Sequence, residues 1–153
     1  MTRFAVLLLI ALAATPVAAQ DAEAAQTESE EADSIIRDGT DATLDEFLWV
    51  ARPVIVFADS PADPNFVQQM EELRARESAL AERDVVVLTD TDPSADSELR
   101  RELRPRGFML VVIGKDGTLI ARKPLPWSER EISRAIDKEP LRQQEVRERG
   151  LAD

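Results

Sequence analysis

The pattern of apolar and polar positions from residue 43 onward predicts a small sheet with helices on both faces. Val54–Ala58, Val85–Leu88 and Phe108–Ile113 are each apolar without interruption. Strands covered on one face alternate apolar and polar residues, so continuous runs are typical of strands covered on both faces. A fourth run, Thr118–Ala121, follows Asp116-Gly117, and an Asp-Gly pair between two such runs predicts a β-hairpin.

Four segments around these strands carry helix signals. The residue just before a helix, the N-cap, is often one whose side chain accepts a hydrogen bond from the backbone of the first turn. Proline is tolerated at the position after the N-cap. The predicted helices are a short one opened by the Thr43–Glu46 capping box, one capped by Asp63 that runs to about Arg83, one from Asp92 that Pro105 ends, and one opened by the Ser128–Glu131 capping box.

The order of these elements, βαβ-α-ββα after the first short helix, predicts an α/β fold. A strand, a helix and a second strand of one sheet form a right-handed unit with parallel strands. The hairpin adds two antiparallel strands, and the helices cover both faces of the sheet. We therefore predict a three-layer sandwich that occupies residues 43–150.

Residues 1–19 have the pattern of a secretory signal peptide. Arg3 precedes an apolar run from Phe4 to Ala14, and Pro16 and the small residues Val17–Ala19 follow. The alternative is a membrane anchor, but the run is shorter than the ~20 residues that a spanning helix needs. We expect cleavage near Ala19 and a periplasmic or secreted protein without an integral membrane span.

Residues 20–42 are predicted to be an acidic, disordered linker. They contain eight acidic residues and one arginine, and Ile35-Ile36 is their only large apolar pair. Such a segment buries too little apolar surface to offset the entropy lost on ordering. A solvated spacer is the ordinary interpretation of a like-charged run, and an acidic binding tail is the alternative.

The composition excludes several classes of function. The chain has no cysteine, no histidine and no tyrosine, which excludes disulfides, a thiol nucleophile, a Cys/His zinc site and a Ser-His-Asp triad. Thirty acidic residues face 19 basic ones, and the formal net charge of -11 argues against a partner made of nucleic acid. We expect no cofactor and no metal.

Five motifs spread from Trp49 to Glu145 match a known family. The motifs are Trp49-x-x-Arg52-Pro53, Val54–Ala58, Arg83–Val87, Gly107-Phe108-x-x-Val111-x-Ile113–Gly117, and Ile136-Asp137-x-x-Pro140-x-Arg142-x-x-Glu145. Together they resemble the DUF4174 family over essentially the whole predicted domain. The most specific combination is the Gly107–Gly117 segment with the Pro140-x-Arg142 motif.

The resemblance implies a thioredoxin-like fold without its redox centre, related to domains of bacterial exported proteins and of animal extracellular proteins with sushi repeats. A thioredoxin carries Cys-x-x-Cys directly after its first buried strand, where this chain has Asp59–Asn65. Its cis-proline precedes the third core strand, where this chain has Gly107–Met109. Without a thiolate there is neither disulfide exchange nor a peroxidatic step. We therefore expect neither a thiol oxidoreductase nor a peroxiredoxin.

Five polar residues form a candidate ligand-binding site: Asp59, Ser60, Asp63, Arg104 and Arg106. Ligands of open α/β sheets bind at the carboxyl ends of the strands, and the free N–H groups of a helix start attract anions. The two arginines could clamp a carboxylate or phosphate near that edge. Structural roles explain the same residues, with Asp63 as a helix cap, Ser60 in a turn and the arginines on a solvated helix face.

Two other motifs favour structural roles over chemistry. Asp90, Asp92 and Asp96 follow the second strand, but their spacing is not that of an EF-hand loop, so we predict solvated acids and a cap. The segment Gly114–Gly117 lacks the phosphate-loop pattern and is predicted to be a turn.

The remaining residues that stand out are two tryptophans and Arg52. Trp49 and Trp127 are predicted to be core anchors, because a tryptophan near a helix end is usually buried. Arg52 is predicted to be structural, with Glu145 as a possible partner, because both residues belong to the motifs of the family.

These observations predict a binding or accessory module of the cell envelope without catalytic residues, whose partner is an unidentified protein or small molecule. A link to oxidative stress is implied only by the family resemblance. The alternative from another class is a cysteine-independent enzyme that uses the Asp59–Asn65 loop. A third possibility is an interaction domain with the acidic linker as its tether.

Overall fold

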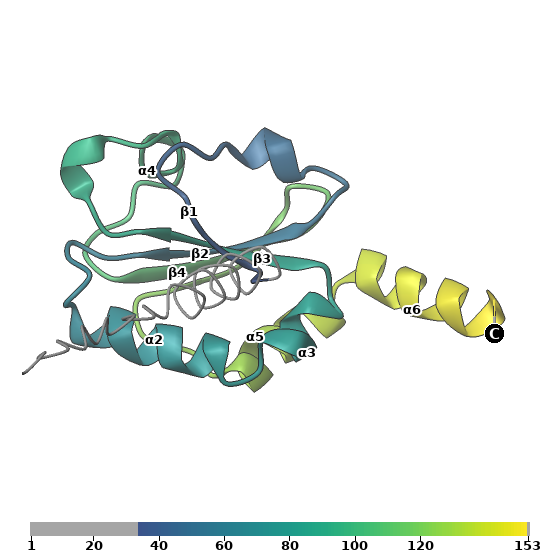
Figure 1. Ribbon diagram of the computed structural model, residues 1–153. Helices are drawn as coiled ribbons and strands as arrows, with labels where there is room; N and C mark the ends of the chain where they lie inside the picture. The colour runs from purple at the N-terminus through teal and green to yellow at the C-terminus, as the bar shows by residue number, and fades with distance from the viewer. Residues whose placement is uncertain (1–33, 153) are drawn as a thin grey trace, which may run out of the picture. The chain divides into compact units, whose positions relative to one another are not determined.

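A computed structural model describes residues 34–152 and contains a five-stranded sheet with helices on both faces (Figure 1). The strands are β1 (Ile36–Asp38), β2 (Arg52–Phe57), β3 (Val85–Asp90), β4 (Met109–Ile113) and β5 (Leu119–Lys123). The helices are η1 (Leu44–Phe47), α2 (Pro64–Arg74), α3 (Glu77–Ala81), η2 (Pro93–Ala95), α4 (Glu98–Leu103), α5 (Glu129–Asp137) and α6 (Pro140–Ala152). No helix in this part of the chain is long and apolar enough to cross a lipid bilayer.

The sheet has the strand order β1-β3-β2-β4-β5, with β2 at its centre. β2 is parallel to its neighbour β3 and antiparallel to its neighbour β4, and β4 and β5 form an antiparallel hairpin. The predicted α/β order is confirmed, including the parallel unit and the hairpin. The turn of the hairpin is closed by hydrogen bonds from Gly117 N to Gly114 O and from Gly114 N to Thr118 O.

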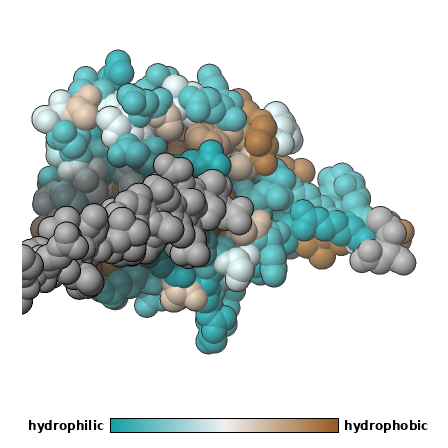
Figure 2. All heavy atoms as spheres, viewed as in Figure 1, coloured by the Kyte–Doolittle hydropathy of each residue, from teal (hydrophilic) through white to brown (hydrophobic). Residues whose placement is uncertain are grey.

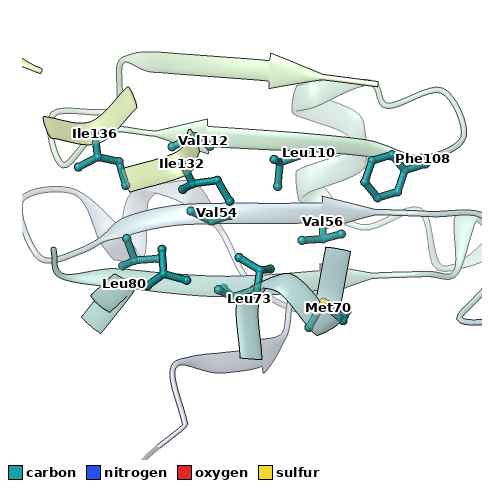
Figure 3. Packing of buried hydrophobic residues seen from close by; sticks show 12 residues of the cluster. Val54, Val56, Met70, Leu73, Leu80, Phe108, Leu110, Val112, Ile132 and Ile136 are labelled. Carbon is teal, nitrogen blue, oxygen red and sulfur yellow. The ribbon is translucent and has the colours of Figure 1, made fainter. Parts of the chain in front are cut away.

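The core lies on both faces of the sheet. Successive side chains of a central strand point to opposite faces, and helices cover each face. One face is covered by α2, α3 and α5, and the other by η1 and α4 (Figure 1). Figure 3 shows the first face, where Val54, Val56, Leu110 and Val112 of the strands meet Met70, Leu73, Leu80, Ile132 and Ile136 of the helices. On the second face Ile55, Phe57, Val86, Leu88, Val111 and Ile113 meet Leu99 and Leu103.

The sheet begins inside the segment predicted to be a linker. Residues 20–33 lie outside the described part of the chain, but Ile36–Asp38 form β1, which pairs in parallel with β3. The main chain of Ile35 accepts a hydrogen bond from Val87 N, and its N–H donates to Glu77 Oε1. The predicted boundary at residue 42 is therefore too late. The short apolar pair Ile35-Ile36 is ordered by pairing with the open edge of β3, and the acidic residues around the pair do not predict this.

Two helices differ from the prediction. The helix expected from Asp63 to about Arg83 is divided, because Arg76 has a non-helical backbone (φ -143°, ψ 44°) between α2 and α3. α6 was not predicted, since its sequence is polar and has no continuous apolar stripe. Ion pairs rather than an apolar face fix it to the rest of the domain.

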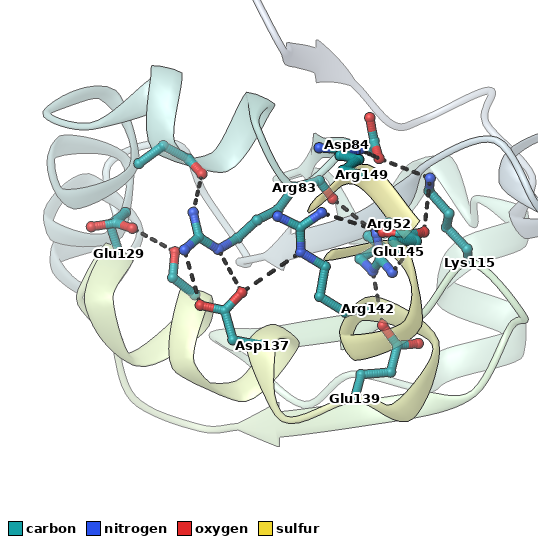
Figure 4. Close-up of polar contacts among 12 residues, drawn as sticks. Arg52, Arg83, Asp84, Lys115, Glu129, Asp137, Glu139, Arg142, Glu145 and Arg149 are labelled. Carbon is teal, nitrogen blue, oxygen red and sulfur yellow. Dashed lines mark hydrogen bonds and ion pairs between the residues drawn. The ribbon is translucent and has the colours of Figure 1, made fainter. Parts of the chain in front are cut away.

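The central ion pair joins Arg52, the first residue of β2, to the C-terminal helices (Figure 4). The Arg52 side chain is fully buried, and its Nε donates to Glu139 Oε2 at 2.8 Å. Its Nη2 donates to Glu145 Oε1 at 3.2 Å, and its Nη1 donates to the carbonyl of Arg83. The predicted pairing of Arg52 with Glu145 is confirmed, and Glu139 is a second, more deeply buried partner. A buried charge of this kind is tolerated only when it is paired.

Lys115 extends this network from the hairpin turn to the start of β3. Its Nζ lies 3.2 Å from Glu145 Oε1 and 2.8 Å from Asp84 Oδ2. Burial alone would raise the pKa of Glu145, but the hydrogen bonds from Arg52 and Lys115 outweigh it and lower the pKa to about 2. The Glu145 carboxylate is therefore a charged group that the folded state strongly favours.

Gly114 allows the close approach of the hairpin to Glu139. A Cβ atom at Gly114 would overlap Glu139 Oε1, the carboxylate oxygen that has no hydrogen-bond partner. The absence of a side chain at this position is therefore a packing requirement, since its backbone angles are open to other residues.

We predict that Glu145→Gln removes part of the loss of stability in acid. Because the folded state lowers the pKa of Glu145 from 4.5 to about 2, its contribution is complete above pH 4.5 and is lost as the pH falls towards 2. That contribution is on the order of 3 kcal/mol. Urea midpoints of wild type and variant at pH 6 and pH 3 measure the effect. Glu148→Gln, an exposed change on the same helix, is the control, and equal acid sensitivity in wild type and Glu145→Gln would contradict the prediction.

We predict that Gly114→Ala destabilises the domain whereas Gly150→Ala does not. The added methyl group at residue 114 forces the buried Arg52–Glu139 pair apart, and overpacking of this kind costs about 1–3 kcal/mol. At Gly150, in α6, a Cβ meets no atom within 4 Å, and alanine is the better helix former. Thermal unfolding of the two variants decides the matter. A Gly114→Ala protein as stable as wild type would show that Glu139 moves aside without cost.

Candidate functional site

The predicted ligand edge lies where β2 and β3 end. Asp59 and Ser60 are exposed in the loop that follows β2, and Asp63 is the N-cap of α2. Asp63 Oδ1 accepts hydrogen bonds from Asn65 N at 2.8 Å and from Phe66 N at 3.2 Å, and Ser60 Oγ accepts one from Ala62 N. Two of the five candidate residues are therefore engaged by the main chain of their own loop.

The two candidate arginines lie on the neighbouring loop between α4 and β4. Arg104 ends α4 with a left-handed backbone, and both Arg104 and Arg106 are exposed. Within residues 34–152 neither arginine makes an ion pair. Asp59 comes close to this loop, since a Cβ at Gly107 would lie 3.9 Å from its Oδ2. The structure thus brings Asp59 beside the loop of Arg106, and the role of the five residues in ligand binding stays a prediction.

A buried ion pair lies beneath this edge and joins the ends of β2 and β3. Arg100 Nε donates to Asp90 Oδ1 at 2.8 Å, and Ser97 Oγ donates to Asp90 Oδ2. Nη2 of Arg100 donates to the carbonyls of Ala58 and Asp90, and the guanidinium lies 5.5 Å from the Phe57 ring centroid. Nε and Nη2 of Arg100 and both carboxylate oxygens of Asp90 are therefore used in contacts at the strand ends.

The expectation that Asp90 is a solvated acid is therefore wrong. The Asp90 side chain is completely buried. The two-residue alternation of side chains along a strand could have predicted its burial. Val86, Leu88 and Asp90 share one face of β3, and that face packs on α4. Asp92 instead has the predicted cap role, accepting a hydrogen bond from Ser94 N. No group of three or more acidic residues in the described part of the chain is arranged to hold a metal ion.

An exposed apolar surface lies at the opposite end of β2, and we call it the Trp49 patch. Trp49 is 69% exposed and Val50 is 68% exposed, with Leu48 and Leu119 as further exposed apolar residues. Leu48 contacts the hairpin turn, since a Cβ at Gly117 would lie 3.1 Å from its Cδ2. Leu119 pairs with Ile113 and so faces the same side of the sheet as Phe47. Figure 2 shows hydrophobic residues at the surface in this region, at the upper right of the view.

The prediction that Trp49 is a core anchor is wrong, and its backbone gives the reason. Trp49 has φ +62°, the left-handed region that an aromatic residue rarely adopts. Its N–H donates to Lys115 O at 2.7 Å, which ties the segment to the hairpin turn. This conformation turns the indole outward, whereas Trp127 packs against the core as expected.

Three solved structures are similar to this chain. The reduced 2-Cys peroxiredoxin of Plasmodium vivax is 14% identical, with a TM-score of 0.51 over 67% of this chain and 84% of that one. A structure described as that of a malarial protein is 18% identical, with a TM-score of 0.49 over 59% and 98% of the two chains. The Plasmodium yoelii thioredoxin peroxidase I is 17% identical, with a TM-score of 0.44 over 67% and 79%. The first of these confirms a thioredoxin-like arrangement and, at this identity, nothing beyond the fold.

The comparison by sequence is more specific. No curated protein matches the chain. The family described as "Domain of unknown function (DUF4174)" matches residues 43–145, which is more than half of the chain and falls inside the predicted domain. These residues include Trp49, Arg52, Gly114 and Glu145, whose contacts are described above. The chain therefore belongs to the DUF4174 family.

Proposed function

We propose that this protein is an exported, non-catalytic binding module of the cell envelope, and that it binds a partner protein through the Trp49 patch. The observation that carries the proposal is a large aromatic side chain held at the surface by a left-handed backbone. Such a conformation costs on the order of 1–3 kcal/mol for a residue other than glycine, and strained residues cluster at functional sites.

The chemistry of the patch supports a protein partner. Leu48, Val50 and Leu119 are exposed apolar residues of the same patch, and Lys115, whose carbonyl accepts from Trp49 N, is occupied by Asp84 and Glu145. Contiguous exposed apolar surface is typical of interaction sites, and tryptophan is enriched among the residues that dominate binding energy. A convex group of this kind binds to a pocket on another protein rather than enclosing a small molecule.

The polar groups at the carboxyl edge of the sheet support a role without catalysis. Asp63 and Ser60 cap their own loop, and Asp90 and Arg100 neutralise each other in the interior. The 153 residues also contain no cysteine with which a thioredoxin-like fold could do redox chemistry. The alternative enzyme at the Asp59–Asn65 loop would depend chiefly on Asp59, which makes no ion pair within residues 34–152.

Export is proposed from the N-terminal pattern alone. We predict that the protein, isolated from its own cells with a C-terminal tag, is found in the periplasmic or extracellular fraction and begins at Gln20. The positive start, apolar run and small residues before that position are the pattern that signal peptidases process. Intact-mass measurement of the fractionated protein tests this, and a chain that retains residues 1–19 in the cytoplasm would refute export.

We predict that Trp49→Ala and Trp49→Gly both abolish capture of the partner while the domain stays folded. The loss expected from removing a dominant aromatic contact is at least about 30-fold in affinity. Glycine also relieves the left-handed strain, so Trp49→Gly is expected to be at least as stable as Trp49→Ala. Quantitative mass spectrometry of proteins retained by the tagged chain measures capture.

Val67→Ala is the matched control, because Val67 is exposed on α2, away from the patch. A partner captured equally by wild type and both Trp49 variants would contradict the proposal. A Trp49→Gly protein that gains stability and keeps its partner would show that the indole serves no binding role.

A further inference from the structure

A hollow of about 420 Å³ lies between the end of α5, the start of α6 and the turn before β3. Its walls are formed by Arg83, Asp137, Arg142, Gln143, Val146 and Arg147. Three of these side chains are positive and one is negative, in a chain whose formal net charge is -11. The hollow is therefore a local concentration of positive charge on an acidic protein.

One face of α6 supplies most of the lining. Arg142 and Val146 are four positions apart, as are Gln143 and Arg147, and residues with this spacing are neighbours on the surface of a helix. The same helix is fixed to the domain through Glu145, so its position relative to α5 is set by the buried pair with Arg52. The hollow is thus built on a rigid support rather than on a loop.

Arg142 has donor capacity that the protein does not use. Its side chain is 9% exposed, and Nη1 donates to Glu145 Oε2 at 3.3 Å. Its Nε is buried without a hydrogen-bond partner and lies 3.7 Å from Asp137 Oδ1, beyond hydrogen-bond distance. A buried N–H of a charged group without an acceptor is costly, so an incoming oxygen acceptor has a favourable place at this side chain.

The negative residue of the hollow is already neutralised by another arginine. Arg83 donates to both oxygens of Asp137, from Nε at 3.0 Å and from Nη2 at 2.9 Å (Figure 4). Arg147 is exposed and makes no ion pair within residues 34–152. Arg142 shares Asp137 with Arg83 and shares Glu145 with Arg52, so these two carboxylates do not fully neutralise it, and Arg142 and Arg147 are the two cations that a ligand would meet in the hollow.

From this arrangement we propose that the hollow binds the oxyanion group of a small ligand, a phosphate or a carboxylate, between Arg142 and Arg147. The planar guanidinium offers parallel donors that match both groups. The volume suits a small organic molecule, and Val146 provides an apolar contact for the part beyond the charged group. This site is separate from the Trp49 patch and does not depend on the proposed function.

The test is titration of the purified protein with inorganic phosphate and with acetate at constant ionic strength. Heat of binding gives the affinity, and the Nε–H resonance of Arg142, identified by its absence in Arg142→Gln, reports contact. Saturable binding with one site and movement of that resonance are expected. Arg147→Gln is expected to weaken binding by about tenfold, the loss of one charge-assisted contact, without changing the unfolding temperature.

Arg74→Gln is the matched control, because Arg74 is exposed on α2, does not line the hollow and makes no ion pair within residues 34–152. Arg142→Gln can also lose stability through its contact with Glu145, so Arg147→Gln decides the outcome. Whichever of phosphate and acetate binds more tightly identifies the source of the oxyanion. Absence of saturable binding by both probes would overturn the proposal, as would equal weakening by Arg74→Gln, which would indicate only a general effect of charge.

Discussion

The buried guanidinium of Arg52 is the constraint on which the rest of this structure depends. A cation at the start of the central strand is taken out of water on all sides, and such a charge is strongly destabilising without partners. Its partners, Glu139 and Glu145, belong to the segment that follows α5 and to α6. The central strand therefore dictates where the C-terminal helices lie, although α6 has no apolar stripe to dock on the sheet. Gly114 and Lys115 then fit the hairpin turn to the same group of charges.

A second buried guanidinium closes the other end of the same strand. Arg100 binds the carbonyl of Ala58, just beyond β2, and both the main chain and the side chain of Asp90 in β3. In a thioredoxin-like fold this end of the sheet is where chemistry is expected. Here the side chains of Ser60, Asp63, Asp90 and Arg100 at this end make structural hydrogen bonds, whereas the two proposed binding surfaces lie towards the Arg52 end. The Trp49 patch immediately precedes β2, and the arginine-lined hollow borders α6.

The elements that could be predicted from the sequence are those specified by nearby residues. Continuous apolar runs identify β2, β3 and β4, and the side chains of Asp63 and Ser128 mark helix starts by hydrogen bonds within one turn. β1 and α6 could not be predicted, because the open edge of β3 orders the first and distant charges hold the second. The inward turn of Arg100 and the outward turn of Trp49 likewise depend on tertiary contacts. The sequence does not distinguish among the four arginines between residues 100 and 106. Arg100 reaches Asp90 because of its position on α4.

The distance along the chain between Arg52 and its counterions constrains the order of folding. Glu139 and Glu145 follow Arg52 by 87 and 93 residues. During synthesis the central strand is therefore complete long before either carboxylate has been made. Burying the strand at that stage would leave the Arg52 cation without a partner in an apolar interior. Domains are made from the N-terminus onward, but in this domain the central strand lacks its counterions until the C-terminal segment has been made. The C-terminal helix is in this sense a latch, and the chain commits to its native state only when that latch arrives.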